Sequence, residues 1–325
     1  MSVPLALARR AAANYLLHRA YCASFELTYN CNARCQHCHR GKVIPREQLA
    51  TPQRLLEVCR SIRPIVAIMS GGEPLIRKEL EEIVRLFREG APALRIFVNT
   101  NGALLTPRRF QRLKEAGVNE FLISFDFPDE RHDEWRAIPG LFGKIESFVG
   151  GLSPDDRRRV VLTAVVTSRN YRELPRMADV ALGWGVNINF STYTWMRTDD
   201  MSLLVPEEEI DELRAVIRRL LEMKAAHGHV LTSDWVLDGM VRFFRREDQG
   251  VCRAGERSLV VNPDGTLSPC GLVIRDFPTR KAMLREFTAH NTCTACYTST
   301  RANSERPARH LFLDHIPYLL HRSTA

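Results

Sequence analysis

The sequence predicts an α/β protein built on a parallel sheet, with a cysteine-rich segment behind it. Two observations lead to this prediction. From residue 22 onward, apolar runs of strand length alternate with stretches of helical periodicity. Of the nine cysteines in the chain, seven fall into two groups, one within residues 31–38 and the other within residues 252–296.

The alternation gives six strands and the helices between them. We expect strands near 22–28, 65–69, 94–99, 120–125, 160–166 and 186–192. We expect helices near 52–63, 77–90, 107–116, 141–150 and 171–184. Gly102, Gly117 and Gly185 fall at turns between these elements. A longer helix over about 206–227 has acidic residues first and Arg218 and Arg219 later, an order that suits the helix dipole.

The first cysteine group consists of Cys31, Cys35 and Cys38, directly after the first predicted strand. A cubane iron–sulfur cluster normally takes four thiolates. Three thiolates on one short loop would leave one iron without a protein ligand, free to bind and activate another molecule. The loop would lie at the carboxyl end of a strand, where α/β barrels place their chemistry.

Two further motifs follow later strands. Gly71-Gly72-Glu73-Pro74 follows the strand at 65–69, and Asn99-Thr100-Asn101-Gly102 follows the run at 94–98. Together with the C-x3-C-x2-C loop, these motifs resemble those of the radical S-adenosylmethionine (SAM) enzymes over residues 24–193. The resemblance implies a partial (β/α)6 barrel and a [4Fe–4S] cluster on the three cysteines. It also implies that SAM binds the open iron and is cleaved to a 5′-deoxyadenosyl radical.

The resemblance extends to the residues that would bind SAM. They occupy the loop after the second strand, the cysteine loop and the ends of strands four and five: Gly71, Gly72, Glu73, Pro74, His37, Ser124, Asp126 and Asn170. His37 stands where the family has an aromatic residue near the adenine, and its alternative role is to pack the loop. For the strand-end residues, the alternative is a capped turn.

The second cysteine group consists of Cys252, Cys270, Cys293 and Cys296. Residues 262–265, Asn-Pro-Asp-Gly, predict a hairpin that brings Cys252 close to Cys270. The C-x(9–15)-G-x4-C spacing at Cys252, Gly265 and Cys270 resembles the SPASM and Twitch extensions of radical SAM enzymes. No cysteine follows Cys296, which implies one auxiliary [4Fe–4S] cluster. The alternative at either cysteine group is zinc, in a protein that is not an enzyme.

These observations divide the chain into five expected segments. They are an amphipathic helical segment at 1–20, a radical SAM core at 21–205, linking helices at 206–247, a Twitch/SPASM-like auxiliary domain at 248–305 and a tail at 306–325. Cys22 and Cys59 are expected to be small buried hydrophobes rather than ligands.

Composition narrows the classes of function. The chain has 325 residues, 45% of them hydrophobic and 26% charged, which is ordinary for a globular protein. No apolar run approaches the ~20 residues of a membrane span. The N-terminus lacks a secretory pattern, so we expect a cytoplasmic protein. The formal net charge of +8 is scattered, without the basic stripe of nucleic-acid binding. It indicates either a solvated surface or attraction to an anionic substrate or membrane.

The substrate is less determined than the cofactors. Five residues that follow the sixth strand are expected at the mouth of the barrel, where a carboxylate could accept a proton: Tyr193, Trp195, Arg197, Asp199 and Asp200. The alternative for the two aspartates is helix capping. No catalytic residue is assigned.

Families with this architecture favour a peptide or protein as the substrate. The alternatives are a sugar, an aminocyclitol, a tetrapyrrole or a membrane lipid. A lipid would be presented by weak association of residues 5–19 and 311–320 with a membrane, unless these segments pack on the barrel. The resemblance also implies an electron donor such as flavodoxin or ferredoxin.

Overall fold

The computed structural model describes residues 3–41, 43–91, 95–273 and 275–307, with side chains of the first helix described from residue 9. Eight strands form one sheet in the order β6-β5-β4-β3-β2-β1-β7-β8. Their bounds are β1 Cys22–Glu26, β2 Val66–Ser70, β3 Arg95–Thr100, β4 Glu120–Ser124, β5 Val160–Val166, β6 Asn187–Thr192, β7 Ser258–Val261 and β8 Leu267–Ser268. Neighbouring strands are parallel except β7 and β8. The sheet is not closed, which gives a partial barrel.

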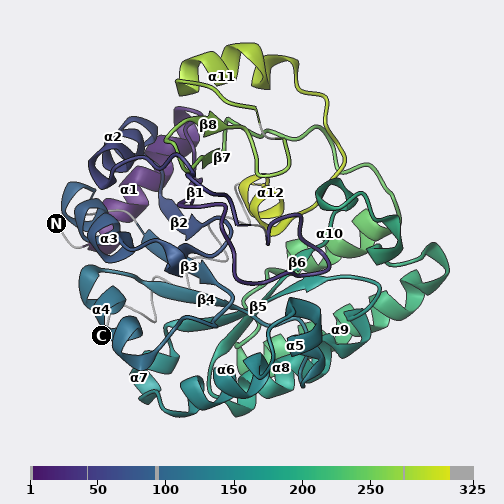
Figure 1. Cartoon of the computed structure of the whole chain (residues 1–325). Helices are drawn as coiled ribbons and strands as arrows, with labels where there is room; N and C mark the ends of the chain where they lie inside the picture. Colours follow the sequence, from purple (N-terminus) through teal and green to yellow (C-terminus); the bar gives the residue numbers. More distant parts are fainter. Residues whose placement is uncertain (1–2, 42, 92–94, 274, 308–325) are drawn as a thin grey trace.

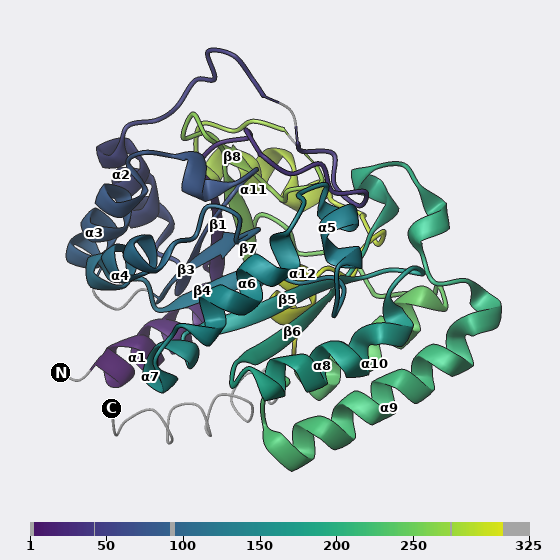
Figure 2. The same cartoon turned by 60° about the horizontal axis from the view of Figure 1, so that its bottom comes forward.

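Twelve helices belong to the described part of the chain. Their bounds are α1 Val3–Leu16, α2 Pro52–Ile62, α3 Leu80–Gly90, α4 Pro107–Ala116, α5 Arg131–Arg136, α6 Leu141–Gly150, α7 Pro154–Arg157, α8 Leu174–Gly183, α9 Ile210–His227, α10 Asp234–Phe244, α11 Arg280–Glu286 and α12 Ser299–Ser304. Figures 1 and 2 show α2, α3, α4, α6 and α8 around the outside of the strands. None of the described helices is long and apolar enough to cross a membrane.

Side-chain alternation along the strands separates the core from the cavity side. In β1 and β2, Ala23, Phe25, Ala67 and Met69 are fully buried, and the ring of Phe25 packs against Phe87 of α3 at 4.9 Å. The intervening residues point the other way, because successive side chains of a strand face opposite sides. The inner side therefore carries polar groups such as Glu26.

Helix boundaries follow recognisable caps. Thr51 and Thr106 accept hydrogen bonds from the backbone N–H groups of Arg54 and Arg109, and a proline begins both helices. The helix expected over 77–90 begins later, at Leu80, because Pro74–Ile76 forms a separate 3-10 turn. The element expected over 171–184 is likewise divided into a 3-10 turn, Tyr171–Glu173, and α8.

The hairpin expected around residues 262–265 is present. β7 and β8 pair antiparallel, with Val260 opposite Ser268, and Gly265 has the positive φ of +85° that the turn requires. β7 also pairs in parallel with β1, from Cys22 opposite Ser258 to Phe25 opposite Val261. The hairpin thus extends the barrel sheet. A domain boundary at residue 248 stays a prediction, since the main sheet continues beyond it.

The N-terminal helix is anchored to the barrel. The side-chain amide of Asn14 donates to the carbonyls of Ala20 and Arg63 at 2.7 and 3.0 Å, and Asn14 is buried. These contacts favour the packed alternative for this end of the chain. Residues 308–325, which include the apolar segment 311–320, lie outside the described residues.

Candidate functional site

The central cavity lies at the carboxyl ends of the parallel strands and has a volume of about 360 Å³. Its walls include every cysteine of both groups: Cys31, Cys35, Cys38, Cys252, Cys270, Cys293 and Cys296. Strand ends of a parallel sheet meet at one edge, which explains why segments far apart in the chain come together here. The structure therefore joins the two cysteine groups in one site.

The first cysteine group lies on the loop after β1. The backbone N–H of Ala33 donates to Cys31 Sγ at 3.4 Å, and a guanidinium nitrogen of Arg136 donates to Cys35 Sγ at the same distance. Burial raises the pKa of Cys31 to about 11 and also raises the pKa of Cys35. Because desolvation disfavours the free thiolates, these sulfurs need a positive partner to ionise.

Gly71 and Gly72 hold the next loop against the cysteine loop. The N–H of Gly72 donates to the carbonyl of Thr28 at 2.7 Å, and that of Glu73 donates to Asn30 at 2.9 Å. A β-carbon at Gly71 would lie 2.2 Å from the Thr28 carbonyl oxygen, and one at Gly72 would lie 2.2 Å from that of Asn30. Only glycine permits this approach of two backbones.

Glu73 is fully buried and ties this loop to the turn after β3. Its carboxylate accepts hydrogen bonds from the N–H of Leu75 at 3.0 Å, the N–H of Asn101 at 2.8 Å and the hydroxyl of Thr100 at 2.8 Å. Burial raises the pKa of Glu73 despite these bonds. The side chain does not line the cavity, so here it organises the two loops instead of facing a ligand.

The other residues expected to bind SAM divide into two sets. His37 and Ser124 line the cavity with Gly71 and Gly72. Pro74, Asp126 and Asn170 do not. Asn170 is fully buried, and its amide donates to the carbonyls of Asp126 and Val165 and accepts from the N–H of Thr167. This geometry is that of a capped turn, the alternative that the sequence left open.

His37 both lines the cavity and packs its own loop. Its ring stacks on Trp135 of α5 with centroids 5.6 Å apart and planes at 20°. Burial lowers the pKa of His37 to about 3, so the ring is neutral near pH 7. A neutral, stacked ring at the cavity wall suits contact with a flat apolar group such as adenine.

The second cysteine group is drawn together by backbone and arginine contacts. The N–H of Cys252 donates to the carbonyl of Cys293 at 2.9 Å, and the N–H of Val273 donates to Cys270 Sγ at 3.3 Å. The buried guanidinium of Arg301 donates to the carbonyls of Cys296 and Gly250, both at 2.5 Å. Burial raises the pKa values of Cys252, Cys270 and Cys296.

The cysteine sulfurs of both groups are the candidate metal ligands of this cavity. Among the described residues, no three His, Cys, Asp or Glu side chains converge as the ligands of one metal ion would. A zinc ion needs its thiolates about 2.3 Å from one point. A cubane cluster is larger and presents its irons at separate corners. Thiols around a shared cavity, several with N–H donors to sulfur, are the kind of ligand that iron–sulfur clusters take.

The residues after β6 separate in the structure. Arg197 lines the central cavity, together with Tyr193. Asp200 caps the 3-10 turn Met201–Leu203 by accepting from the N–H of Ser202 at 2.9 Å, which favours the capping alternative for this aspartate. Glu26 and Arg40, absent from the sequence-based candidates, form an ion pair of 2.9 Å on the cavity wall. Glu26 could have been singled out from the sequence, because it is a charged residue inside the apolar run at 22–28.

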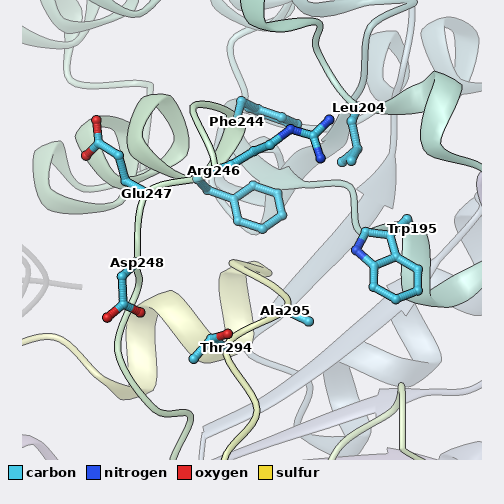
Figure 3. Close-up of a pocket in the computed structure, with 9 residues that line it drawn as sticks. Trp195, Leu204, Phe244, Arg246, Glu247, Asp248, Thr294 and Ala295 are labelled. Atoms are coloured by element: carbon cyan, nitrogen blue, oxygen red, sulfur yellow. The ribbon is translucent and has the colours of Figure 1, made fainter.

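A second cavity, of about 440 Å³, borders the second cysteine group from another side. Figure 3 shows Trp195, Leu204, Phe244 and Arg246 around it, with Thr294 and Ala295 opposite. Thr294 and Ala295 are the two residues between Cys293 and Cys296. One loop thus separates the two cavities.

Known proteins resemble this chain in sequence and fold. The chain is 33% identical to the AdoMet-dependent heme synthase of Methanosarcina barkeri over 163 residues, 49% of this chain and 46% of the relative. It is 25% identical to the PqqA peptide cyclase of Granulibacter bethesdensis over 257 residues, 75% of this chain and 66% of the relative. It thus spans about half to two thirds of the length of these curated relatives.

Solved structures share the fold. Streptococcus suis SuiB bound to its precursor peptide SuiA superposes with a TM-score of 0.64 at 12% identity, covering 85% of this chain and 68% of SuiB. Residues 25–178 match the family model described as the radical SAM superfamily. Members of this superfamily bind a [4Fe–4S] cluster and SAM. The chain therefore contains a radical SAM domain over residues 25–178.

Proposed function

We propose that this protein cleaves SAM reductively at a [4Fe–4S] cluster on Cys31, Cys35 and Cys38, and that it modifies a substrate by removing a hydrogen atom from carbon. The observation that carries the proposal is the shared cavity, which has three thiols on one wall and four on another. When bound, cluster and SAM supply the electron and the 5′-deoxyadenosyl radical. The chain itself supplies position and exclusion of water.

Each wall contributes a defined part. The glycine loop, residues 71–72, presents backbone to the cavity beside the first cysteine group, which suits the methionine end of SAM. His37 and Ser124 would face the adenosine. Glu73, Asp126 and Asn170 would act indirectly, because their side chains hold the loops that carry these groups.

We also propose one auxiliary [4Fe–4S] cluster on Cys252, Cys270, Cys293 and Cys296. Four thiols on the same cavity would close such a cluster coordinatively and place it near the substrate. It would then take an electron from the substrate radical or hold the substrate. A small electron carrier such as flavodoxin or ferredoxin would reduce the first cluster, and a cytoplasmic setting would keep the seven thiols reduced.

For the substrate we propose a peptide or protein. The supporting comparisons are the PqqA peptide cyclase and the SuiB complex with its precursor peptide. A second candidate is a carboxylate-bearing tetrapyrrole. It is favoured by the heme synthase relative and by Arg197, which lines the cavity and has no ion pair or side-chain hydrogen bond among the described residues.

The experiment that tests this function needs no substrate. The chain is reconstituted with iron and sulfide without oxygen, reduced with dithionite and given SAM, and 5′-deoxyadenosine is measured. We expect the product from the wild type and none from Cys35→Ala. Replacing Cys293 and Cys296 together should remove roughly four irons and leave cleavage intact. Iron-loaded, reduced protein that forms no 5′-deoxyadenosine would contradict the proposal.

The substrate class is then tested with the same readout. A substrate accelerates SAM cleavage because hydrogen transfer consumes the radical. Peptides encoded beside the gene and coproporphyrin III, as its iron complex, are compared in parallel. Acceleration by the peptide alone supports the first candidate, and acceleration by the porphyrin alone replaces it with the second.

A further inference from the structure

The short helix α5 lies directly against the first cysteine loop. The N–H of Arg34 donates to the carbonyl of Arg136 at 3.1 Å, and that of Gln36 donates to Trp135 at 3.3 Å. The last carbonyls of a helix have no partner inside it. Here they hold the backbone of the loop on either side of Cys35, so the position of this cysteine depends on α5.

Arg136 adds its side chain to this contact. One terminal nitrogen donates to Cys35 Sγ at 3.4 Å, while Nε and the other terminal nitrogen reach Asp126 at 2.6 and 2.5 Å. Arg136 is 8% exposed and Asp126 is fully buried. A guanidinium held by a carboxylate on one side offers its remaining N–H groups in a fixed direction.

Asp126 is itself fixed and charged. Its second oxygen accepts from the N–H of Val165 in β5 at 2.9 Å. Burial alone would raise the pKa of this carboxyl, but Arg136, followed by His37 and His132, lowers it overall. The pair is therefore ionic, with the cation on the side of the cysteine and the anion behind it.

This arrangement has a consequence for a cluster bound at Cys35. Reduction adds an electron, so a cation that donates a hydrogen bond to a ligand sulfur stabilises the reduced form more than the oxidised one. Net charge and hydrogen bonds to sulfur set cluster potentials, and their effect is larger in a poorly solvated site.

We propose that Arg136 is a positioning residue that raises the reduction potential of the cluster on Cys31, Cys35 and Cys38, and that Asp126 limits this rise as its counter-charge. The inference rests on the proposed function. It adds that this chain sets the reduction potential at which the first cluster accepts its electron. It predicts opposite shifts. Arg136→Gln removes the cation and makes the potential more negative, whereas Asp126→Asn leaves the cation uncompensated and makes it more positive.

The test is an anaerobic redox titration of the full-length, reconstituted protein followed by electron paramagnetic resonance. The first cluster is identified as the signal that changes when SAM is added. Arg136→Lys keeps the charge and should stay near the wild-type potential. Matched controls are Arg95→Gln and Glu120→Gln, an ion pair of 2.8 Å at the opposite end of the strands. Glu120 precedes Asp126 by six residues, which is roughly 20 Å of extended chain. These controls should leave the potential unchanged.

A purely structural role would give a different pattern. Arg136→Gln and Asp126→Asn would then both lose iron, or shift the potential in the same direction, and either result overturns the proposal. Weaker SAM binding in Arg136→Gln without any shift of potential would make the arginine a SAM contact and also overturns it. If Arg136→Gln does not fold, the other two variants decide. The proposal then requires a more positive potential in Asp126→Asn than in Arg136→Lys. Wild-type protein with no SAM-responsive cluster refutes the proposed function itself.

Discussion

The side chain of Tyr297 occupies the place that a side chain at Gly239 would need. A β-carbon at Gly239 in α10 would lie 1.9 Å from the phenol oxygen and 2.2 Å from the adjacent ring carbon. Tyr297 directly follows Cys296, is 6% exposed, and donates to the carbonyl of Trp235 at 3.3 Å. The contact fixes the cysteine pair at 293–296 to α10.

Gly239→Ala should therefore disturb the second cysteine group and spare the first. The added methyl displaces a rigid ring, which costs about 1–3 kcal/mol in a packed site. We expect roughly four fewer irons per chain and unchanged SAM cleavage. Because the ring carbon clashes as well as the oxygen, adding Tyr297→Phe should not restore the iron, whereas adding Tyr297→Leu should. Full iron content in Gly239→Ala would show that the contact does not position the cysteines.

Replacing glycine with alanine should have opposite effects on stability at two positions, one crowded and one open. Gly72→Ala places a methyl 2.2 Å from the Asn30 carbonyl, which cannot move without displacing the cysteine loop. We expect loss of the first cluster and of SAM binding. Gly143→Ala in α6 meets no atom within 4 Å and should raise stability by about 0.5–1 kcal/mol. Iron analysis checks the loss of the cluster in Gly72→Ala, and thermal unfolding checks the gain in stability of Gly143→Ala.

Glu73 should be needed for shape as much as for charge. Glu73→Gln replaces one acceptor oxygen with a donor that faces the N–H of Asn101 or Leu75. An unsatisfied buried group costs about 1–3 kcal/mol, so we expect that loss in urea unfolding together with weaker SAM binding. Glu57→Gln, at an exposed ion pair with Arg54 in α2, is the control and should cost less than about 1 kcal/mol. Equal losses in the two variants would refute this role.

His132 predicts an acid sensitivity of the fold. Burial lowers its pKa from 6.5 to about 4, and the N–H of Asp126 donates to its Nδ1. The unfolded chain binds the proton below pH 6.5 while the folded chain resists it down to about pH 4. Stability is therefore lost as the pH falls through this window, by up to about 3 kcal/mol.

His132→Asn keeps an acceptor for Asp126 and removes the titration. The stability difference between wild type and variant, measured by urea unfolding at pH 7 and pH 4.5, should shrink on acidification. A constant difference would mean that His132 has the same pKa in the folded and the unfolded chain.

Much of the barrel could be predicted from the sequence because its strands and helices are defined by local patterns. The strand at 160–166 and the helices at 107–116 and 141–150 have the expected bounds. The helix α5 was not expected. Its six residues are too few to give a periodic signal, and the residue that caps it with a positive φ of 53° is Ala137 instead of a glycine. α5 matters for the site because its last residue, Arg136, contacts Cys35, which lies 101 positions earlier in the chain.

The candidate site shows the same division. The cysteines and the glycine loop lie together on the cavity, as their motifs indicate, although their binding of cluster and SAM stays a prediction. The directions of Glu73 and Asn170 could not be predicted. Each side chain turns toward backbone N–H or carbonyl groups that tertiary packing leaves without a partner. The sequence identifies which loops meet. Packing decides which polar side chains bond to the backbone of those loops instead of facing the cavity.

The parallel pairing of β7 with β1 sets a condition on how this protein is made. β1 ends at Glu26, whereas β7 begins at Ser258. At 5–20 residues per second, a ribosome takes roughly 10–50 s to synthesise the chain between them. During that time one edge of β1 has no strand to pair with, and the three thiols beside it are already outside the ribosome. Under the proposed function, iron and sulfur are therefore best delivered to the new chain after β7 has emerged.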